Sequence, residues 1–222
     1  MFLIKDYQTI FCPNGCKIFS DGNNYEYWEN KETTSDELEI TNFLKSHISQ
    51  NIKLLHIGVG NSYLAKSLNN QVIIDGISIS SNEINYAKKL NLSNYNVYFS
   101  NKLGKDSLKF LKENYYDFII DLNLKSFSCC DIAFDEMFRK YSNLLNKNGK
   151  ILTAKDGLNW TRLLKPVYRF SFKKFFYRRL KEFDGPERNK LSMNDCLKLA
   201  SNNNLNLEEI INSNIISFKK QI

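Results

Sequence analysis

A short glycine-containing segment follows the first long apolar run of the chain. Gly58 and Gly60 lie two positions apart in the stretch 54–62, which reads Leu-Leu-His-Ile-Gly-Val-Gly-Asn-Ser. Two glycines let the backbone turn tightly and approach a ligand closely, and Ser62 can cap a following helix. Tyr63 occupies the position of the third glycine of the dinucleotide fingerprint, which argues against NAD. The residues expected to form this ligand-binding turn are Gly58, Gly60, Asn61 and Ser62.

Polar side chains also follow three later apolar runs. Ser78 lies near the end of the second run, Asn101 follows the third, and Asp121 ends the fourth. In an open parallel sheet, ligands bind beyond the carboxyl ends of the strands, so we expect these side chains to face the glycine turn. Asp121 is our candidate for the reaction zone. The alternative is that its carboxylate caps the next loop.

Five cysteines form two pairs and a single residue. Cys12 and Cys16 flank a Pro-Asn-Gly turn, Cys129 and Cys130 are adjacent, and Cys196 stands alone. A metal site is conceivable, but Cys-x₃-Cys is looser than the usual Cys-x₂-Cys knuckle, and no histidine lies near either pair. We therefore favour reduced thiols in a turn and a core, and expect no metal.

The positive charge of the chain is concentrated in one window. Between Trp160 and Lys190, ten Lys and Arg stand against three Asp and Glu, a difference equal to the net charge of +7. An apolar stripe at helical spacing comprises Tyr168, Phe172, Phe176, Leu180 and Phe183, and the cations beside it include Arg169, Lys173, Lys174, Arg178 and Arg179. One interpretation is a packing or lid helix with solvated cations. The other is a face that binds an anionic partner: a membrane surface, a nucleic acid or a phosphorylated saccharide.

The elements that must position these residues alternate between strand and helix. A capping-box pattern at Thr34–Glu37 predicts a helix from about residue 38 to 48. Strands are predicted at 53–59, 71–79, 95–99, 117–122 and 150–154, with helices at 63–68, 82–90, 105–113 and 131–145. A helix at 193–201 and strands at 205–211 and 214–219 follow. Such alternation indicates a parallel sheet with helices on both faces.

Length and composition are those of one α/β domain. The 222 residues, 42% of them hydrophobic, suffice for a single core. We divide the chain into an N-terminal cap (1–33), a ligand-binding core (34–159), a basic aromatic insertion (160–190) and a final helix with strands (191–222). No apolar run is long enough for a membrane span and no signal-peptide pattern is present, so we expect a cytoplasmic protein.

Four segments together resemble the class I S-adenosylmethionine (SAM) dependent methyltransferases. Residues 54–62 resemble motif I, 76–87 the segment around the second strand, 116–121 motif IV, and 144–152 the turn into the fifth strand. They occur in the order and spacing of that family. The resemblance implies a Rossmann-like three-layer sandwich with a mostly parallel seven-stranded sheet and a helical insertion after strand five. It also implies methyl transfer from SAM to an unidentified acceptor, for which the basic window suggests an anion.

Three acidic residues that the family commonly uses are absent. His56 stands where an acid in strand one helps to hold the methionine moiety, and Ser78 where an acid takes both ribose hydroxyls. Asn101 or Lys102 stands where an aspartate often contacts the adenine. Asp75 lies three residues before Ser78 and so points to the opposite face. The residues that the resemblance assigns to SAM are His56, Gly58, Gly60, Asn61, Ser62, Ser78, Ile79, Asn101 and Asp121.

These departures leave other functions open. A serine in place of a carboxylate could cost about ten- to a hundredfold in affinity. The chain could therefore be a methyltransferase-like binding module that holds an anionic partner through its basic window. An aminopropyltransferase is less favoured, because the basic window would repel a polyamine. For His56, a buried core residue is favoured over a catalytic base, because a strand-one side chain sits behind the cofactor.

Overall fold

The computed structural model describes residues 10–18, 33–47, 51–68, 72–126, 128–158 and 191–221. Most of the predicted N-terminal cap and the whole basic window of 160–190 lie outside these ranges, so the helix and the cationic face predicted there remain predictions. No helix among the described residues is both long and apolar enough to cross a membrane.

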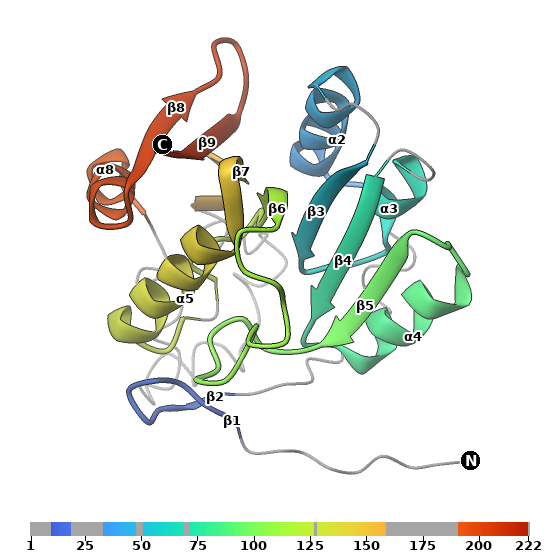
Figure 1. Cartoon of the computed structure of the whole chain (residues 1–222), viewed down its shortest axis with the longest axis horizontal. Helices are drawn as coiled ribbons and strands as arrows, with labels where there is room; N and C mark the ends of the chain where they lie inside the picture. The colour runs from blue at the N-terminus through green and yellow to red at the C-terminus, as the bar shows by residue number, and fades with distance from the viewer. Residues whose placement is uncertain are drawn as a thin grey trace, which may run out of the picture.

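A seven-stranded sheet forms the centre of the described chain (Figure 1). Its strands lie in the order β5-β4-β3-β6-β7-β9-β8, and β9 is antiparallel to both of its neighbours while the other pairs are parallel. The strands are β3 Ile52–Ile57, β4 Val72–Ser78, β5 Tyr95–Phe99, β6 Tyr116–Ile120, β7 Leu145–Ala154, β8 Leu205–Glu209 and β9 Ile215–Lys220. The predicted mostly parallel seven-stranded sheet is confirmed.

Helices cover both faces of this sheet. The helices are α2 Ser35–His47, α3 Tyr63–Ser67, α4 Ser81–Lys89, α5 Asp131–Leu144 and α8 Met193–Asn202. Apolar residues of α2, α3 and α4 pack with Leu54 and Ile120, whereas those of α5 and α8 pack with Leu55 and Ile119. Neighbouring residues of a strand point to opposite faces, so each buried strand supplies both cores. The result is the three-layer sandwich expected from the alternation.

A small hairpin packs beside α5 on the same face. Its strands, β1 Ile10–Phe11 and β2 Lys17–Ile18, pair in antiparallel fashion, and Ile18 is buried in the core that α5 covers. The Lys105 backbone N–H donates to the Phe11 carbonyl at 2.9 Å. The hairpin is therefore attached to the segment that follows β5.

The helix predicted at 105–113 is wrong. Residues 102–110 form consecutive turns, and Leu108 has a φ of +67°, which a right-handed helix does not allow. The Ser107 hydroxyl donates to the carbonyls of Lys102 and Gly104, which competes with helical hydrogen bonding. The apolar residues of this segment, such as Leu108 and Leu111, pack into the core from irregular turns instead.

The sheet reverses its strand order between β3 and β6. The chain proceeds from β3 outward to β4 and β5, then crosses back to place β6 on the other side of β3. The loops that leave β3 and β6 thus diverge in opposite directions and open a crevice at their carboxyl ends. The predicted ligand-binding segments all lead into this crevice.

Candidate functional site

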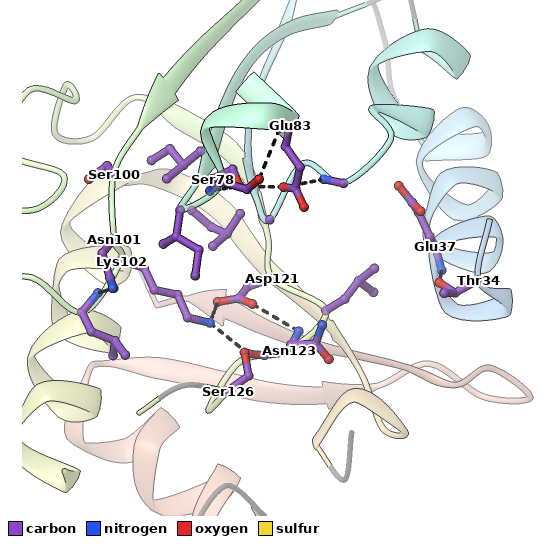
Figure 2. A pocket seen from close by; sticks show the side chains of 18 of the residues that line it. Thr34, Glu37, Ser78, Glu83, Ser100, Asn101, Lys102, Asp121, Asn123 and Ser126 are labelled. Atoms are coloured by element: carbon purple, nitrogen blue, oxygen red, sulfur yellow. Dashed lines mark hydrogen bonds and ion pairs between the residues drawn. The ribbon is translucent and has the colours of Figure 1, made fainter. Parts of the chain in front are cut away.

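A cavity of about 240 Å³ lies at the carboxyl ends of the central strands. Figure 2 shows side chains around it from α2 on one side, from the segment after β5 on the other, and from the ends of β4 and β6 between them. Its lining includes apolar side chains, Ile57, Ile77, Ile79, Leu103 and Leu122, and the carboxylates of Asp36, Glu37, Glu83 and Asp121. A mainly apolar hollow with a few convergent polar groups is typical of a small-molecule site.

The glycine turn forms one wall as predicted, although only in part. Gly58 and Gly60 line the cavity with φ values of +79° and +49°, a region in which glycine is unstrained. Asn61 and Ser62 are not among the lining residues, and the Ser62 hydroxyl contacts Tyr95 Oη at 3.2 Å rather than capping α3. The predicted cap by Ser62 is wrong, because its backbone adopts a left-handed conformation with φ of +57°.

His56 lies behind the cavity and does not line it. Its side chain is 1% exposed on β3, and burial lowers its pKa to about 4, so the ring is neutral at physiological pH. Its Nδ1 atom has no hydrogen-bond partner among the described residues. The structure places His56 as the favoured interpretation expected, in the core rather than at the reaction zone.

Ser78 lines the cavity and brings a carboxylate there that the sequence analysis missed. The Ser78 hydroxyl donates to Glu83 Oε2 at 2.6 Å, and the Gly60 N–H donates to the same oxygen at 3.2 Å. Glu83 is 7% exposed, and burial raises its pKa against the opposing effect of these two hydrogen bonds. Among the described residues, Oε1 of Glu83 accepts no hydrogen bond. A carboxylate therefore stands at the end of β4, supplied by α4 instead of by the strand.

Two further carboxylates reach the cavity from α2. Asp36 and Glu37 line it, and burial raises the pKa of both, that of Glu37 to about 7. Asp36 accepts a hydrogen bond from Asn214 Nδ2 at 2.7 Å. Asp75, by contrast, accepts from Tyr116 Oη at 2.5 Å and does not line the cavity, in agreement with its predicted orientation.

Glu37 and Glu83 both occupy the third helical position of a capping-box pattern. In each helix the cap residue accepts from the glutamate N–H: Thr34 Oγ1 at 3.3 Å in α2 and Ser80 Oγ at 3.4 Å in α4. The reciprocal bond, in which the cap N–H donates to the glutamate carboxylate, is not made in either helix of the described chain, although the matching box at the start of α8 is complete. Both glutamates line the cavity instead.

Asp121 lines the cavity from the end of β6, where it is held by three donors. Lys102 Nζ contacts Asp121 Oδ2 at 2.7 Å, Tyr141 Oη donates to the same oxygen at 3.0 Å, and the Asn123 N–H donates to Oδ1 at 3.2 Å. Lys102 Nζ also donates to the carbonyls of Asn123 and Leu124. Asp121 thus fulfils the alternative of a loop cap, and three donors leave about one of the four acceptor sites of its carboxylate for a substrate.

The remaining predicted residues lie where the sequence placed them. Ile79 and Asn101 both line the cavity, and Asn101 is 6% exposed. Asn101 Oδ1 accepts from the Leu103 N–H at 3.0 Å, which shapes the turn after β5. Of the nine residues assigned to SAM, the structure brings Gly58, Gly60, Ser78, Ile79, Asn101 and Asp121 to the cavity and leaves out His56, Asn61 and Ser62.

Comparison with known proteins identifies the fold through solved structures. No protein-family model and no curated protein matches the sequence. A TehB-like SAM-dependent methyltransferase from Corynebacterium glutamicum matches with a TM-score of 0.59 and 14% identity, over 90% of this chain and 97% of that chain. A SAM-dependent methyltransferase from Aquifex aeolicus matches with a TM-score of 0.58 and 12% identity, over 90% and 98%.

A third structure shows how widely this architecture is used. The [4+2]-cyclase SpnF matches with a TM-score of 0.52 and 15% identity, over 77% of this chain and 57% of that chain. The matches to the two methyltransferase structures each cover 90% of this chain. The chain therefore has the Rossmann-like α/β fold of the class I SAM-dependent methyltransferases.

Proposed function

We propose that the chain binds SAM in the cavity and transfers its methyl group to an acceptor. The observation that carries this proposal is the position of the Glu83 carboxylate, which lies at the end of β4 between the Ser78 hydroxyl and the Gly60 N–H. This is where the resemblance expects an acid for the ribose hydroxyls. The structural likeness to SAM-dependent methyltransferases supports the same cofactor.

We assign each part of SAM to residues that line the cavity. Oε1 of Glu83 would accept hydrogen bonds from the ribose hydroxyls, because both described bonds to Glu83 use Oε2. Asp36 and Glu37 would hold the ammonium group of the methionine moiety. The apolar side chains of Ile79 and Leu103 would contact the adenine ring. Carboxylates from helices would thus serve the methionine moiety and the ribose, whereas the adenine would be held by apolar contacts.

Catalysis would rest mainly on alignment. Bound SAM would supply a methyl group on a sulfonium, and in-line attack of a nucleophile on that carbon would break its bond to sulfur and release S-adenosylhomocysteine. Such a displacement needs orientation more than proton transfer, and orientation can contribute several kcal/mol to rate acceleration, about 7–11 in well-aligned cases. Lys102, Tyr141 and the Asn123 N–H hold Asp121 in place, so we assign it a positioning role for the β6 loop.

The acceptor is proposed to carry negative charge. The excess of ten Lys and Arg over three Asp and Glu between residues 160 and 190 would favour an anionic group by electrostatic steering. Neutralising Arg169, Lys173, Arg178 and Arg179 together should impair acceptor binding and leave SAM affinity unchanged. A parallel loss of SAM affinity would mean that this segment supports the cavity itself.

Isothermal titration calorimetry with SAM and S-adenosylhomocysteine tests the cofactor directly. We expect both to bind with one site per chain, while NAD, which the glycine pattern disfavours, gives no heat of binding. No heat with either adenosyl ligand at millimolar concentration would refute the proposal and favour the binding module. That alternative was motivated by missing carboxylates, and Asp36, Glu37 and Glu83 weaken its basis.

A further inference from the structure

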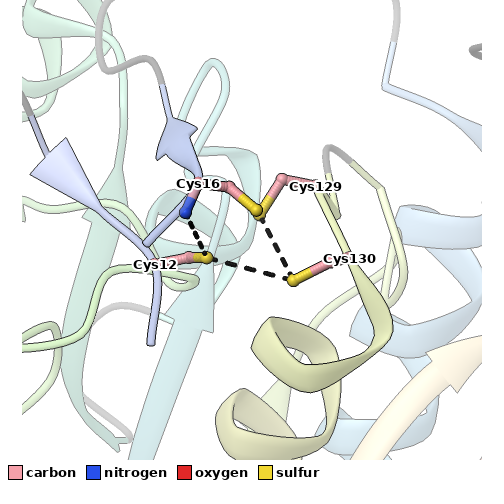
Figure 3. Close-up of side chains that lie close together, drawn as sticks. All are labelled: Cys12, Cys16, Cys129 and Cys130. Atoms are coloured by element: carbon pink, nitrogen blue, oxygen red, sulfur yellow. Dashed lines mark hydrogen bonds between the residues drawn. The ribbon is translucent and has the colours of Figure 1, made fainter. Parts of the chain in front are cut away.

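Four of the five cysteines converge at one point of the structure. Cys12 and Cys16 come from the hairpin of β1 and β2, whereas Cys129 and Cys130 immediately precede α5 (Figure 3). Their Sγ atoms all lie within 4.8 Å of one another. Two pairs that appeared unrelated in the sequence therefore form a single cluster.

The spacing of the sulfur atoms suits one tetrahedral metal ion. A zinc–sulfur bond of about 2.3 Å places the sulfurs of a tetrahedron about 3.8 Å apart. Cys130 Sγ lies 3.9 Å from Cys12 Sγ and 3.9 Å from Cys129 Sγ. A disulfide needs a sulfur–sulfur distance of about 2.05 Å, and all five cysteines of the chain are free thiols. The sulfur–sulfur distances therefore match shared coordination of one metal ion better than a disulfide bond.

One cysteine of each pair accepts a backbone hydrogen bond on its sulfur atom. The Cys16 N–H donates to Cys12 Sγ at 3.3 Å, across a turn that Gly15 closes with a φ of +76°. The Ala133 N–H donates to Cys130 Sγ at 3.4 Å, because Cys130 is the N-terminal cap of α5. Hydrogen bonds from backbone amides and a helix N-terminus both stabilise negative charge on sulfur.

We propose that Cys12, Cys16, Cys129 and Cys130 bind a single zinc ion through their four thiolates. A site in which the protein fills all four positions is closed to substrate, so its role is structural. The isolated Cys-x₃-Cys spacing argued against a metal only when each pair was considered alone. This proposal does not depend on SAM binding.

The ion would link the hairpin to the β6–α5 connection, which forms part of the wall of the cavity. Two-residue strands are too short to be stable alone, and metal binding can contribute folding free energy directly. Ser126, which lines the cavity, belongs to the same β6–α5 connection as Cys129 and Cys130. The hairpin also contacts Lys105, in the segment after β5 whose residues 100–103 form another part of the wall. The ion would therefore stabilise two sides of the cavity at once.

Metal analysis of the purified full chain, expressed in zinc-supplemented medium and kept reduced, tests the proposal. We expect about one zinc ion per chain by inductively coupled plasma mass spectrometry. Replacing any one of the four cysteines with alanine should weaken zinc binding at least roughly tenfold, since even outer partners of ligands contribute about 10–100-fold. The matched control is Cys196→Ala, which removes a buried thiol outside the cluster and should keep the zinc.

A second measurement keeps the proposal testable if the alanine variants fail to fold. Cobalt substituted into the wild-type chain should show the thiolate charge-transfer band and the intense visible bands of tetrahedral four-sulfur coordination. A chain that retains no stoichiometric metal after zinc addition and dialysis would overturn the proposal. So would an intact mass that shows disulfides, or a cobalt spectrum without four thiolates.

Discussion

Replacing Glu83 with Gln removes one negative charge from the cavity and preserves the size of the side chain. Glu83 Oε2 accepts from the Ser78 hydroxyl and the Gly60 N–H, and a glutamine carbonyl can accept from both. The cap of α4 is also retained, because it uses the backbone N–H of residue 83. Glu83→Gln therefore changes the charge at the end of β4 with little change of structure.

The expected loss of affinity follows from the strength of the hydrogen bonds. Bonds to a charged acceptor contribute about 1.5–3 kcal/mol and neutral ones about 0.5–1.5 kcal/mol, a difference of roughly 1–2 kcal/mol. Since about 1.4 kcal/mol corresponds to a factor of ten, SAM should bind roughly five- to thirtyfold more weakly. Burial raises the pKa of Glu83, so removing its charge should leave the thermal unfolding midpoint unchanged or higher.

Calorimetric titration of wild type, Glu83→Gln and Glu113→Gln with SAM provides the assay. Glu113 is an exposed glutamate that does not line the cavity, so Glu113→Gln carries the same charge change as a control. An affinity of folded Glu83→Gln within twofold of wild type would refute the role assigned to this carboxylate. An equal loss in Glu113→Gln would show that only the net charge of the chain matters.

Three further predictions concern Glu37, Lys102 and Gly58. Burial raises the Glu37 pKa from 4.5 to about 7. Between these two pH values the folded state therefore binds more protons than the unfolded state, and the free energy of unfolding of the wild type falls as the pH rises from 4.5 to about 7. In urea unfolding, Glu37→Gln should thus be more stable than wild type by up to about 3 kcal/mol near pH 8, and the two should be equally stable near pH 4. A difference that does not change with pH would contradict the raised pKa of Glu37 as its cause. Lys102→Met leaves Asp121 buried without its cation and should cost about 3–5 kcal/mol in the same assay, partly recovered by adding Asp121→Asn; no recovery would show that packing dominates. Gly58→Ala should cost about 1–2 kcal/mol because its φ is +79°, while an added Cβ meets no described atom within 4 Å; an unchanged unfolding midpoint would show that the turn relaxes.

The sequence predicts the layers of this fold well, because alternating apolar segments report burial directly. Each central strand is apolar on both faces, and the segment from Lys53 to Val59 illustrates this pattern. The helix predicted at 105–113 is wrong because apolar spacing reports burial alone, and apolar residues can also be buried from irregular turns. There the left-handed Leu108 and the Ser107 hydroxyl decide the local conformation, and periodicity detects neither.

The candidate site is predictable from its strands and not from its helices. Motif spacing identifies Gly58, Gly60 and Ser78 because they belong to strand ends, where position along the chain fixes position in space. Glu37 and Glu83 reach the cavity from helices, and their orientation depends on tertiary packing. The signal was present, because each stands three residues after a cap residue, but that pattern predicts a local capping bond in place of a cavity lining.

The attachment of the hairpin has a consequence for the kinetics of unfolding. Cys12 and Cys130 are separated by 118 residues, and the hairpin strands have only two residues each. Closing so long a loop costs conformational entropy, and the few contacts of the hairpin can offset this cost only after the sheet and α5 have formed. Contacts made after the transition state affect the unfolding rate and leave the folding rate nearly unchanged. We therefore expect a change that weakens the hairpin to speed unfolding and to leave the folding rate nearly unchanged.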